Sequence, residues 1–389
     1  MEPLRGTRKM SAATYPNYSP GLEGVIGGIT SISDISSEES KLIYRGYDVH
    51  DLASRGSFEQ TAYLLLYGKL PNQQELDGFT KTLAQERAVP DQVYTALKQL
   101  PKGTHPMDIA KVGYAVAAPY DPDYAAPATD QQANLRKAVR IVARGSTIVG
   151  NGHRIRNGQE PLQPKKEHTV AQNFLYLMSG QEPDAETAHV LDSSLTLYAE
   201  HGYNASTFAC RVTVATLSDI YSGIVSGIGT LRGPLHGGAN EEAMKMLEQI
   251  GSPDKAEAWI RDALATKKKI MGFGHREYKK RDPRAIYMTK VGKELTVKKG
   301  MTKWSEIADI LERVMETEKG IYPNVDFPAA YAYYALGIPV DLYTPIFVIA
   351  RVSGWSAHAL EQLANNRLIR PACIYEGPRS ATWVPIEQR

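Results

Sequence analysis

The stretch TPIFVIARVSGWSAHALEQLANN, residues 344–366, decides how this chain folds. Its apolar residues recur at three- and four-residue spacing, which predicts a helix with little polar surface. Arg351 stands near the middle of the stretch. A guanidinium among apolar side chains needs an anionic partner, from the protein or from a ligand. The stretch therefore predicts a buried helix with an anionic group beside its centre.

Helical patterns extend along most of the remaining chain. In SFEQTAYLLLYGKLP, residues 57–71, Ser57 is a candidate N-cap, and Gly68 and Pro71 are stop signals. Further helices are predicted at 74–87, 106–120, 130–145, 186–202, 255–269, 283–299 and 305–320. The expected fold class is all-α, with a minor β element.

The strand signals are confined to the ends of the chain. GVIGGITSIS (24–33) and SKLIYRGYDV (40–49) are rich in β-forming residues and are separated by DISSEE (34–39), which predicts a small hairpin. ACIYEG, residues 372–377, is a candidate for a last short strand.

The composition narrows the class of protein. The chain has 389 residues, of which 42% are hydrophobic and 23% charged, enough for one large core or two domains. A net charge of +2 argues against a nucleic-acid partner or a membrane surface, and no apolar run reaches the ~18–20 residues of a membrane span. Cys210 and Cys373 are too few for a disulfide framework, which favours a reducing, cytoplasmic location. Residues 1–20 are expected to form a disordered leader.

One histidine lies in a loop that is unusually rich in glycine. GPLHGGAN, residues 233–240, places His236 among three glycines, and Glu241 and Glu242 follow in the first turn of a helix. One interpretation is an incidental histidine at a helix entry. The other is an imidazole that backbone and substrate approach closely because glycine leaves room around it.

Three further polar groups stand out from their surroundings. His201 lies in EHGYNAST, His275 in MGFGHREYKKRDPRA, and Asp326 in YPNVDFPAAYAYY. Asp326 is surrounded by apolar and aromatic residues, so desolvation favours its neutral form and makes its ionised form a better base. Asp326 also precedes a proline that suits an early helical position, so a helix cap is an alternative role.

Positive charge is concentrated around His275. Residues 267–284 contain eight basic and two acidic residues. This window suits a polyanionic ligand that carries phosphates, and a solvated basic face is the alternative. Arg370, in RLIRP, is a further arginine of interest, and the alternative interpretation is that it is an ordinary exposed surface residue. No H-x-H, H-E-x-x-H or C-x-x-C spacing occurs, and we expect no metal site.

Taken together, these motifs resemble those of the citrate synthase family. EHGYNAST, GPLHGGAN, MGFGHREYKKRDPRA, YPNVDF and RLIRP occur in this order, and the start PGLEGV…LIYRGYD is similar to the bacterial type. The likeness extends from about Gly21 to the C-terminus. It implies a helical homodimer, or a higher oligomer, whose protomer has two domains. The large domain would comprise residues 21–225 and 332–389, and the small domain residues 226–331. Separately from the resemblance, the Gly- and Pro-rich composition of residues 226–235 and 320–328 predicts hinges there.

The resemblance also implies an activity. It is the Claisen-type condensation of acetyl-CoA with oxaloacetate, followed by thioester hydrolysis to citrate and CoA, in the tricarboxylic acid cycle. No cofactor is implied, since acetyl-CoA is a substrate. 2-Methylcitrate synthase, which uses propionyl-CoA, shares these motifs, and one methylene is worth only ~1–3 kcal/mol in a pocket. A catalytically inactive scaffold is the alternative from another class, and retention of the site residues argues against it.

By motif position, the resemblance assigns a role to each site residue. The catalytic residues would be His236, His275 and Asp326. Oxaloacetate would be held by His201, Arg284, Arg351 and Arg370, the last from the partner subunit. CoA would be bound by Lys268, Ile270, Met271, Gly272, Gly274 and Lys279. Asp326 would remove a methyl proton, His236 would donate to the enolate oxygen, and His275 would donate to the ketone oxygen.

Overall fold

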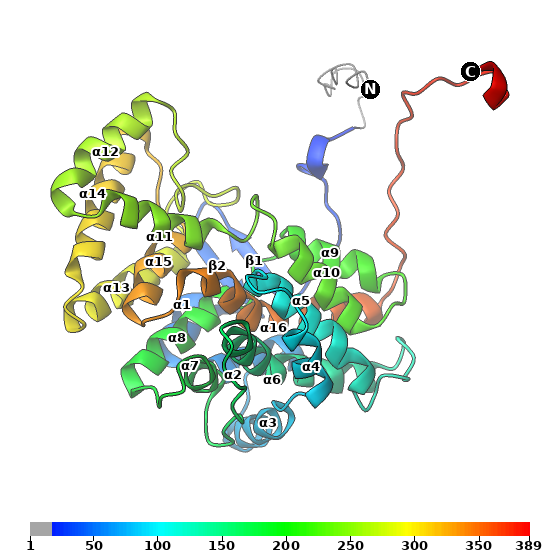
Figure 1. Ribbon diagram of the computed structural model, residues 1–389, viewed down its shortest axis with the longest axis horizontal. Helices are drawn as coiled ribbons and strands as arrows, with labels where there is room; N and C mark the ends of the chain where they lie inside the picture. Colours follow the sequence, from blue (N-terminus) through cyan, green and yellow to red (C-terminus); the bar gives the residue numbers. More distant parts are fainter. Residues whose placement is uncertain (1–17) are drawn as a thin grey trace.

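The central helix of the fold is the one predicted from residues 344–366. The computed structural model describes residues 18–389, and in it α16 spans Tyr343–Ala364 with nearly every residue buried. Figure 1 shows α16 in the middle of the molecule. It packs against seven α-helices: α2 (Phe58–Tyr67), α5 (Pro106–Ala117), α6 (Gln131–Arg156), α8 (Ala185–Tyr198), α9 (Ala205–Val214), α10 (Ile220–Leu231) and, less extensively, α11 (Ala239–Ile250).

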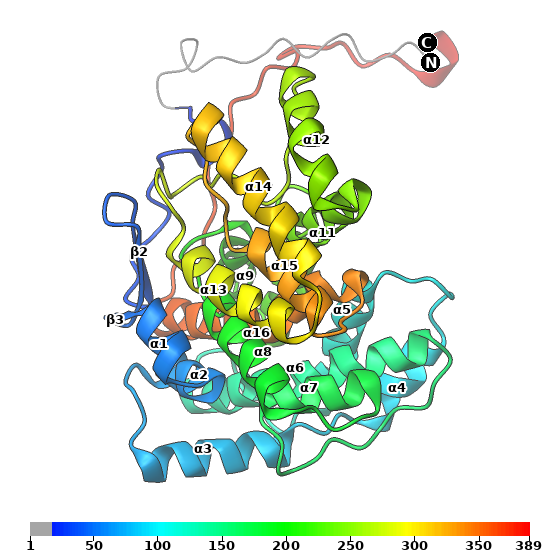
Figure 2. The ribbon, with the colours of Figure 1, turned by 90° about the vertical axis from the view of Figure 1, so that its left-hand side faces the viewer.

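The remaining helices form an outer layer and a separate group. The outer layer contains α1 (Val49–Arg55), α3 (Gln73–Glu86), α4 (Asp91–Lys98) and α7 (Val170–Ser179). The separate group lies to the left in Figure 1 and at the top in Figure 2, and it comprises α11 (Ala239–Ile250), α12 (Pro253–Ala265), α13 (Pro283–Lys298), α14 (Thr302–Lys319) and α15 (Asp326–Ala335). The all-α fold class is confirmed.

Local signals explain where these helices begin and end. The Ser57 side chain accepts a hydrogen bond from the backbone N–H of Gln60, and Gly68 ends α2 in the left-handed conformation, both as predicted. The helix predicted at 130–145 continues to Arg156. Gly145 does not stop it, because this glycine lies where α6 crosses α16 and an added Cβ would stand 2.9 Å from the Tyr114 hydroxyl oxygen.

The predicted hairpin is real, but its strands are shifted along the chain. β1 (Ser33–Ser36), β2 (Lys41–Tyr44) and β3 (Tyr47–Asp48) form an antiparallel sheet in that order, with Ser33 opposite Tyr44. The expectation that 34–39 is the turn was wrong: β1 occupies half of it, because Leu42 and Tyr44 of β2 are buried and select this register. Residues 24–32 form no strand.

The C-terminal tail also differs from expectation. Residues 372–377 were expected to form a last strand, but no strand is assigned to them in the structure. The tail after α16 stands clear of the body (Figure 1), so it has no sheet edge to join.

The domain division and the leader remain predictions. The boundaries at 225/226 and 331/332 fall inside α10 and α15, and the glycine-rich loop 232–238 and the loop 320–325 lie just beyond these helix ends. The leader, residues 1–20, falls mostly outside the described residues.

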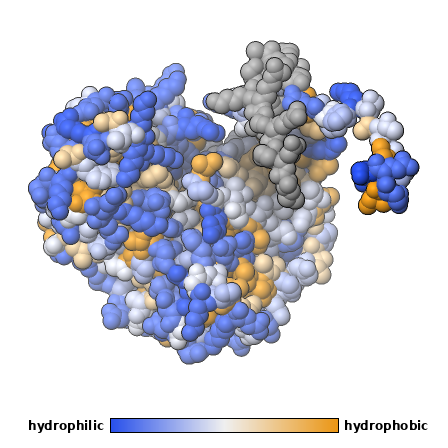
Figure 3. Space-filling view, turned by 45° about the horizontal axis from the view of Figure 1, so that its top comes forward, coloured by the Kyte–Doolittle hydropathy of each residue, from blue (hydrophilic) through white to orange (hydrophobic). Residues whose placement is uncertain are grey.

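The surface of the helix group is polar. Figure 3 shows mostly hydrophilic residues over the left-hand lobe that carries α12 and α14. Across residues 18–389, no helix is both long enough and apolar enough to cross a membrane.

Candidate active site

A cavity of about 650 Å³ brings most of the predicted site residues together. Its walls come from the end of α8, the start of α9, the loops 232–238 and 266–281, the start of α15, and α16. The predicted site residues that line it are His201, His236, Ile270, Met271, Gly272, Gly274, His275, Arg284, Asp326 and Arg351. Segments more than a hundred residues apart in the sequence therefore meet at one place.

His236 is held so that one ring nitrogen is free to donate. Its Nε2 lies 3.3 Å from the backbone nitrogen of Ser206 and 2.8 Å from the Ser206 hydroxyl oxygen. A nitrogen that accepts from a backbone N–H carries no proton, so the neutral ring bears its proton on Nδ1. Burial, and then the charge of Arg351, lowers the pKa of His236 to about 4. The ring is therefore a neutral donor near pH 7.

His275 has the opposite tautomer. Its Nδ1 accepts the backbone N–H of Glu277 at 3.0 Å, so Nε2 carries the proton. Burial, and then the charge of Arg284, lowers the pKa of His275 to about 4, so this ring too is neutral. The Arg284 Nη2 lies 3.4 Å from this Nε2, so the proton-bearing nitrogens of both side chains lie side by side at the cavity.

Asp326 is the desolvated carboxylate of the cavity, whereas the other lining carboxylate, Glu277, is exposed. Its Oδ1 accepts a hydrogen bond of 2.7 Å from the Tyr198 hydroxyl. Desolvation raises its pKa, and the Tyr198 hydrogen bond and the charge of Arg284 act in the other direction. The alternative of a helix cap was wrong: Val325 holds the N-cap position, and Asp326 is the first residue of α15, where its own N–H is accepted by Oδ1 of Asn324 at 3.1 Å.

Two buried arginines supply positive charge to the same space. Arg284 is paired with Asp282, through contacts of 3.0 Å from Nε to Oδ1 and 2.8 Å from Nη2 to Oδ2. Arg351 is 1% exposed; its Nε donates to the Tyr198 carbonyl at 2.8 Å, while its Nη1 has no hydrogen-bond partner in the described residues. An incompletely paired buried guanidinium is a strong site for a carboxylate ligand.

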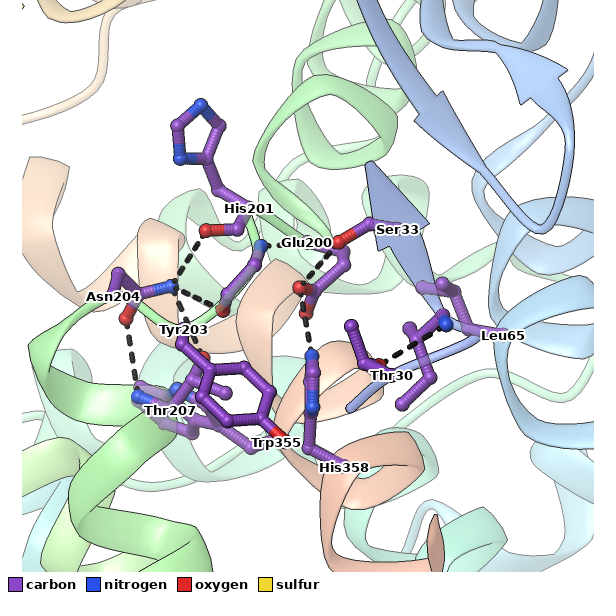
Figure 4. Close-up of polar contacts among 12 residues, drawn as sticks. Thr30, Ser33, Leu65, Glu200, His201, Tyr203, Asn204, Thr207, Trp355 and His358 are labelled. Carbon is purple, nitrogen blue, oxygen red and sulfur yellow. Dashed lines mark hydrogen bonds and ion pairs between the residues drawn. The ribbon is translucent and has the colours of Figure 1, made fainter. Parts of the chain in front are cut away.

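Hydrogen bonds in the short segment between α8 and α9 fix the position of His201. Asn204 caps α9 by accepting the Thr207 N–H, and its Nδ2 donates to the His201 carbonyl at 3.3 Å. Figure 4 shows the His201 ring pointing away from the buried contact between Glu200 and His358. Its Nε2 lies 3.1 Å from the Tyr278 hydroxyl oxygen, and burial holds its pKa well below the usual value.

A contact between two loops places His275 beside Asp326. Gly274 donates its N–H to the Tyr322 carbonyl, and Asn324 donates its N–H to the Gly272 carbonyl, both at 2.9 Å. Gly272 has φ +81°, and an added Cβ would stand 2.8 Å from the Cβ of Phe327. This glycine is required because the two loops touch at that point.

The structure does not bring every predicted residue to the cavity. Lys268 and Lys279 lie outside it, with the Lys268 ammonium 4.9 Å from the centre of the Trp259 ring; Lys269 and Arg276 line it instead. Arg370 is exposed in the tail and does not line the cavity of its own chain. No group of three or more His, Cys, Asp or Glu side chains in residues 18–389 is arranged to hold a metal ion.

Sequence reasoning missed five supporting residues, which are Tyr198, Ser206, Tyr278, Asp282 and Asn324. Asp282 had a readable signal: an acid two residues before an arginine at a helix start. The others act across long sequence separations, and a single sequence carries no sign of such contacts.

The chain is similar to known proteins over nearly its whole length. A family model described as "Citrate synthase, C-terminal domain" matches residues 21–372. The chain is 46% identical to citrate synthase 2 of Bacillus subtilis, covering 95% of this chain and 98% of that one. It is 42% identical to 2-methylcitrate synthase of Mycobacterium tuberculosis, covering 96% and 95%.

The chain is also similar to solved structures of citrate synthases. Citrate synthase from Pyrobaculum aerophilum matches with a TM-score of 0.90 and 38% identity, covering 95% of each chain. The ternary complex of citrate synthase from Thermoplasma acidophilum with carboxymethyl coenzyme A and oxaloacetate matches with a TM-score of 0.90 and 36% identity, covering 96% of this chain and 100% of that one.

Proposed function

Because the chain belongs to the citrate synthase family, whose members transfer an acyl group in a condensation, we propose that it condenses acetyl-CoA with oxaloacetate and releases citrate and CoA. The observation that carries the proposal is the arrangement of a desolvated carboxylate and two neutral imidazoles with opposite tautomers around one cavity. That combination suits removal of a proton from a weak carbon acid beside a carbonyl group.

Proton removal is the first step. Asp326 takes a proton from the methyl group of the thioester, and negative charge develops on the thioester oxygen. The Nδ1–H of His236 donates to this oxygen as the charge forms. Ser206 fixes that tautomer in advance, so the ring needs no reorganisation during the reaction.

Carbon–carbon bond formation is the second step. The enolate carbon attacks the ketone carbon of oxaloacetate, and the Nε2–H of His275 donates to the ketone oxygen and protonates the alkoxide. Arg284, Arg351 and His201 hold the two carboxylates, because guanidinium forks match carboxylates in geometry. Water then hydrolyses the thioester. These steps require no metal or redox cofactor, since the two imidazoles supply the polarisation.

Coenzyme A enters along the loop 266–281. Ile270, Met271, Gly272 and Gly274 line the cavity, and Lys269 and Arg276 lie at its wall, where they face an incoming phosphate. Lys268 and Lys279 act, in this proposal, at longer range through their charge. Movement of residues 226–331 relative to the remainder of the protomer would close the cavity, since both of these parts contribute walls to it.

The proposal includes a homodimer in a reducing cytoplasm. Arg370 of one chain completes the site of the other, which fits its exposed position in a tail that stands clear of its own body. Cys210 and Cys373 are both free, as a reducing compartment allows.

One assay tests the function and its alternative. Release of CoA thiol is measured with oxaloacetate and either acetyl-CoA or propionyl-CoA. We expect a higher kcat/KM with acetyl-CoA. A higher value with propionyl-CoA would establish 2-methylcitrate synthase activity, as in the relatives of that name, and no release with either thioester would overturn the proposal.

A further inference from the structure

The general base of the cavity is held by a side chain that no motif singled out. Tyr198 is the last residue of α8 and is 1% exposed. Its hydroxyl donates to Oδ1 of Asp326 at 2.7 Å. Within residues 18–389, no second side chain donates a hydrogen bond to this carboxylate.

Tyr198 is itself fixed by two other groups of the cavity. Its carbonyl accepts the Nε–H of Arg351 at 2.8 Å, and its ring meets the Phe347 ring edge-on, with centroids 4.6 Å apart. The hydroxyl therefore has a set position, and Asp326 lies against it across 128 residues of sequence.

A carboxylate that removes a proton needs one oxygen free and aimed at the methyl group. Here Oδ1 is taken by Tyr198, so Oδ2 is the oxygen left to act. The donated hydrogen bond also stabilises the ionised form, which is the only form that accepts a proton.

We propose that Tyr198 is the positioning residue of the base: its hydroxyl holds one oxygen of Asp326 and keeps the carboxylate ionised, so that the other oxygen faces the substrate. This inference rests on the proposed function and adds a residue to it. Tyr198 does not exchange a proton with the substrate.

The surroundings of Asp326 determine how the pH profile would respond. The titratable or charged groups that face it are Tyr198 from α8, Asp282 and Arg284 from the start of α13, Arg351 from α16 and Tyr333 from α15 itself. Loss of the Tyr198 hydroxyl leaves the charged groups in place and removes the donor, so the pKa of Asp326 rises. His236 and His275 keep their own partners, so their pKa values near 4 stay where they are.

The test is the pH dependence of kcat for Tyr198→Phe. Because activity needs ionised Asp326, we expect the acid limb to move to higher pH by roughly one unit, as the loss of a hydrogen bond to a charged group implies. On the plateau we expect kcat to fall about tenfold from lost orientation, with both KM values within about twofold of wild type. An acid limb that coincides with that of wild type overturns the proposal.

Tyr333→Phe is the matched control. Tyr333 is buried on α15, two turns beyond Asp326, and its hydroxyl lies 2.5 Å from that of Ser194 instead of at the carboxylate. Its acid limb should match wild type. An equal shift in both variants would mean that loss of any buried hydroxyl moves the limb, and the proposal would fail.

A second substitution keeps the shape of the residue. With 3-fluorotyrosine at position 198, the phenol is a stronger donor, so the acid limb should move to lower pH, opposite to the phenylalanine variant. The 3-fluorotyrosine variant tests the role of Tyr198 even if the Tyr198→Phe variant does not fold. An acid limb that stays at the wild-type pH in this variant counts against the proposal. Wild-type enzyme that releases no thiol would overturn the proposed function instead, so the two failures are distinguishable.

Discussion

At the scale of the residue, hydrogen bonds within the protein fix the proton positions of both imidazoles in the cavity. Each of the two imidazoles receives a backbone N–H on one nitrogen, from Ser206 for His236 and from Glu277 for His275. The other nitrogen must then carry the proton, and burial keeps both rings neutral. The donors are thus preorganised for two different oxygens.

The first prediction concerns the base. Asp326→Asn should lower kcat by ~10²–10⁴, the usual span for loss of a general base. The fold should remain, because the amide oxygen still accepts the Tyr198 hydrogen bond. Thiol release and thermal unfolding are measured on the same sample. We expect Tm to be equal to or higher than that of wild type, since a desolvated charge has been removed; near wild-type turnover would show that Asp326 is not the base.

At the scale of the element, the site depends on two loops that touch. The loop before α13 carries His275, and the loop before α15 leads directly into Asp326, the first residue of that helix. Their backbone hydrogen bonds join Gly274 to Tyr322 and Asn324 to Gly272. Any change that separates the loops also separates His275 from Asp326, the two groups proposed to act in catalysis.

Gly272→Ala tests this contact. The left-handed φ costs an alanine about 1–2 kcal/mol, and the Cβ would also collide with Phe327, the residue after Asp326. We expect a loss of stability larger than the cost of φ alone, together with a loss of kcat greater than tenfold.

Gly300→Ala is the control for that test. Gly300 has φ +66° and no neighbour within 4 Å of an added Cβ, so it reports the cost of φ without the collision. We expect a similar φ penalty and unchanged kcat. Chemical denaturation and thiol release are measured for both variants, and equal effects on kcat would show that the loop contact does not support catalysis.

Another prediction at the scale of the element concerns the binding of CoA by the loop 266–281. Lys269→Ala combined with Arg276→Ala should raise the KM for acetyl-CoA roughly three- to tenfold, because the double variant loses two proposed contacts to CoA phosphates that solvent partly screens. The KM for oxaloacetate and kcat should change little, and the effect should shrink at high salt. Lys102→Ala, an exposed lysine between α4 and α5, is the control. Equal KM values in the double variant and wild type would return this stretch to a solvated basic face.

At the scale of the whole molecule, the cavity lies between two groups of helices. α8, α9 and α16 supply one wall, and α15 with the loops 232–238 and 266–281 supplies the other. In the described part of the chain Arg351 keeps an unpartnered Nη1 there, and Arg370 is absent from the lining. A second copy of the chain would bring the missing arginine.

Mixed dimers test whether the site is shared. Arg370→Ala and His275→Ala homodimers should each be nearly inactive. In a mixed dimer, the site on the Arg370→Ala chain keeps its own His275 and receives an intact Arg370, while the other site carries both lesions. We therefore expect about half of the wild-type activity per mixed dimer. The measurement is thiol release by dimers isolated through two different tags.

The same experiment distinguishes the alternative arrangement. If Arg370 serves its own chain, each site in the mixed dimer has one lesion and mixing restores nothing. Wild-type chains carrying the two tags are the control for chain exchange, and they should retain full activity. A purified mixed dimer without rescue would contradict the shared site and leave the roles of His236, His275 and Asp326 unaffected.

The sequence by itself predicted the helices, and most of the candidate site residues that it named line the cavity. Periodicity located α16, and Ser57 with Gly68 located both ends of α2, because these signals act between neighbours a few residues apart. The resemblance of the motifs to a known family singled out the three catalytic candidates, and their roles stay predictions. The hairpin register was not predicted correctly, because burial of Leu42 and Tyr44 selects the register, whereas local β propensity does not.

Only the tertiary structure decided how the site is supported. The tautomer of His236 depends on Ser206, 30 residues away, and the environment of Asp326 depends on Tyr198, 128 residues away. Which basic residues line the cavity was likewise settled by loop packing, which put Lys269 and Arg276 there in place of Lys268 and Lys279. Such contacts form between segments that the fold brings together, so no spacing in the chain records them.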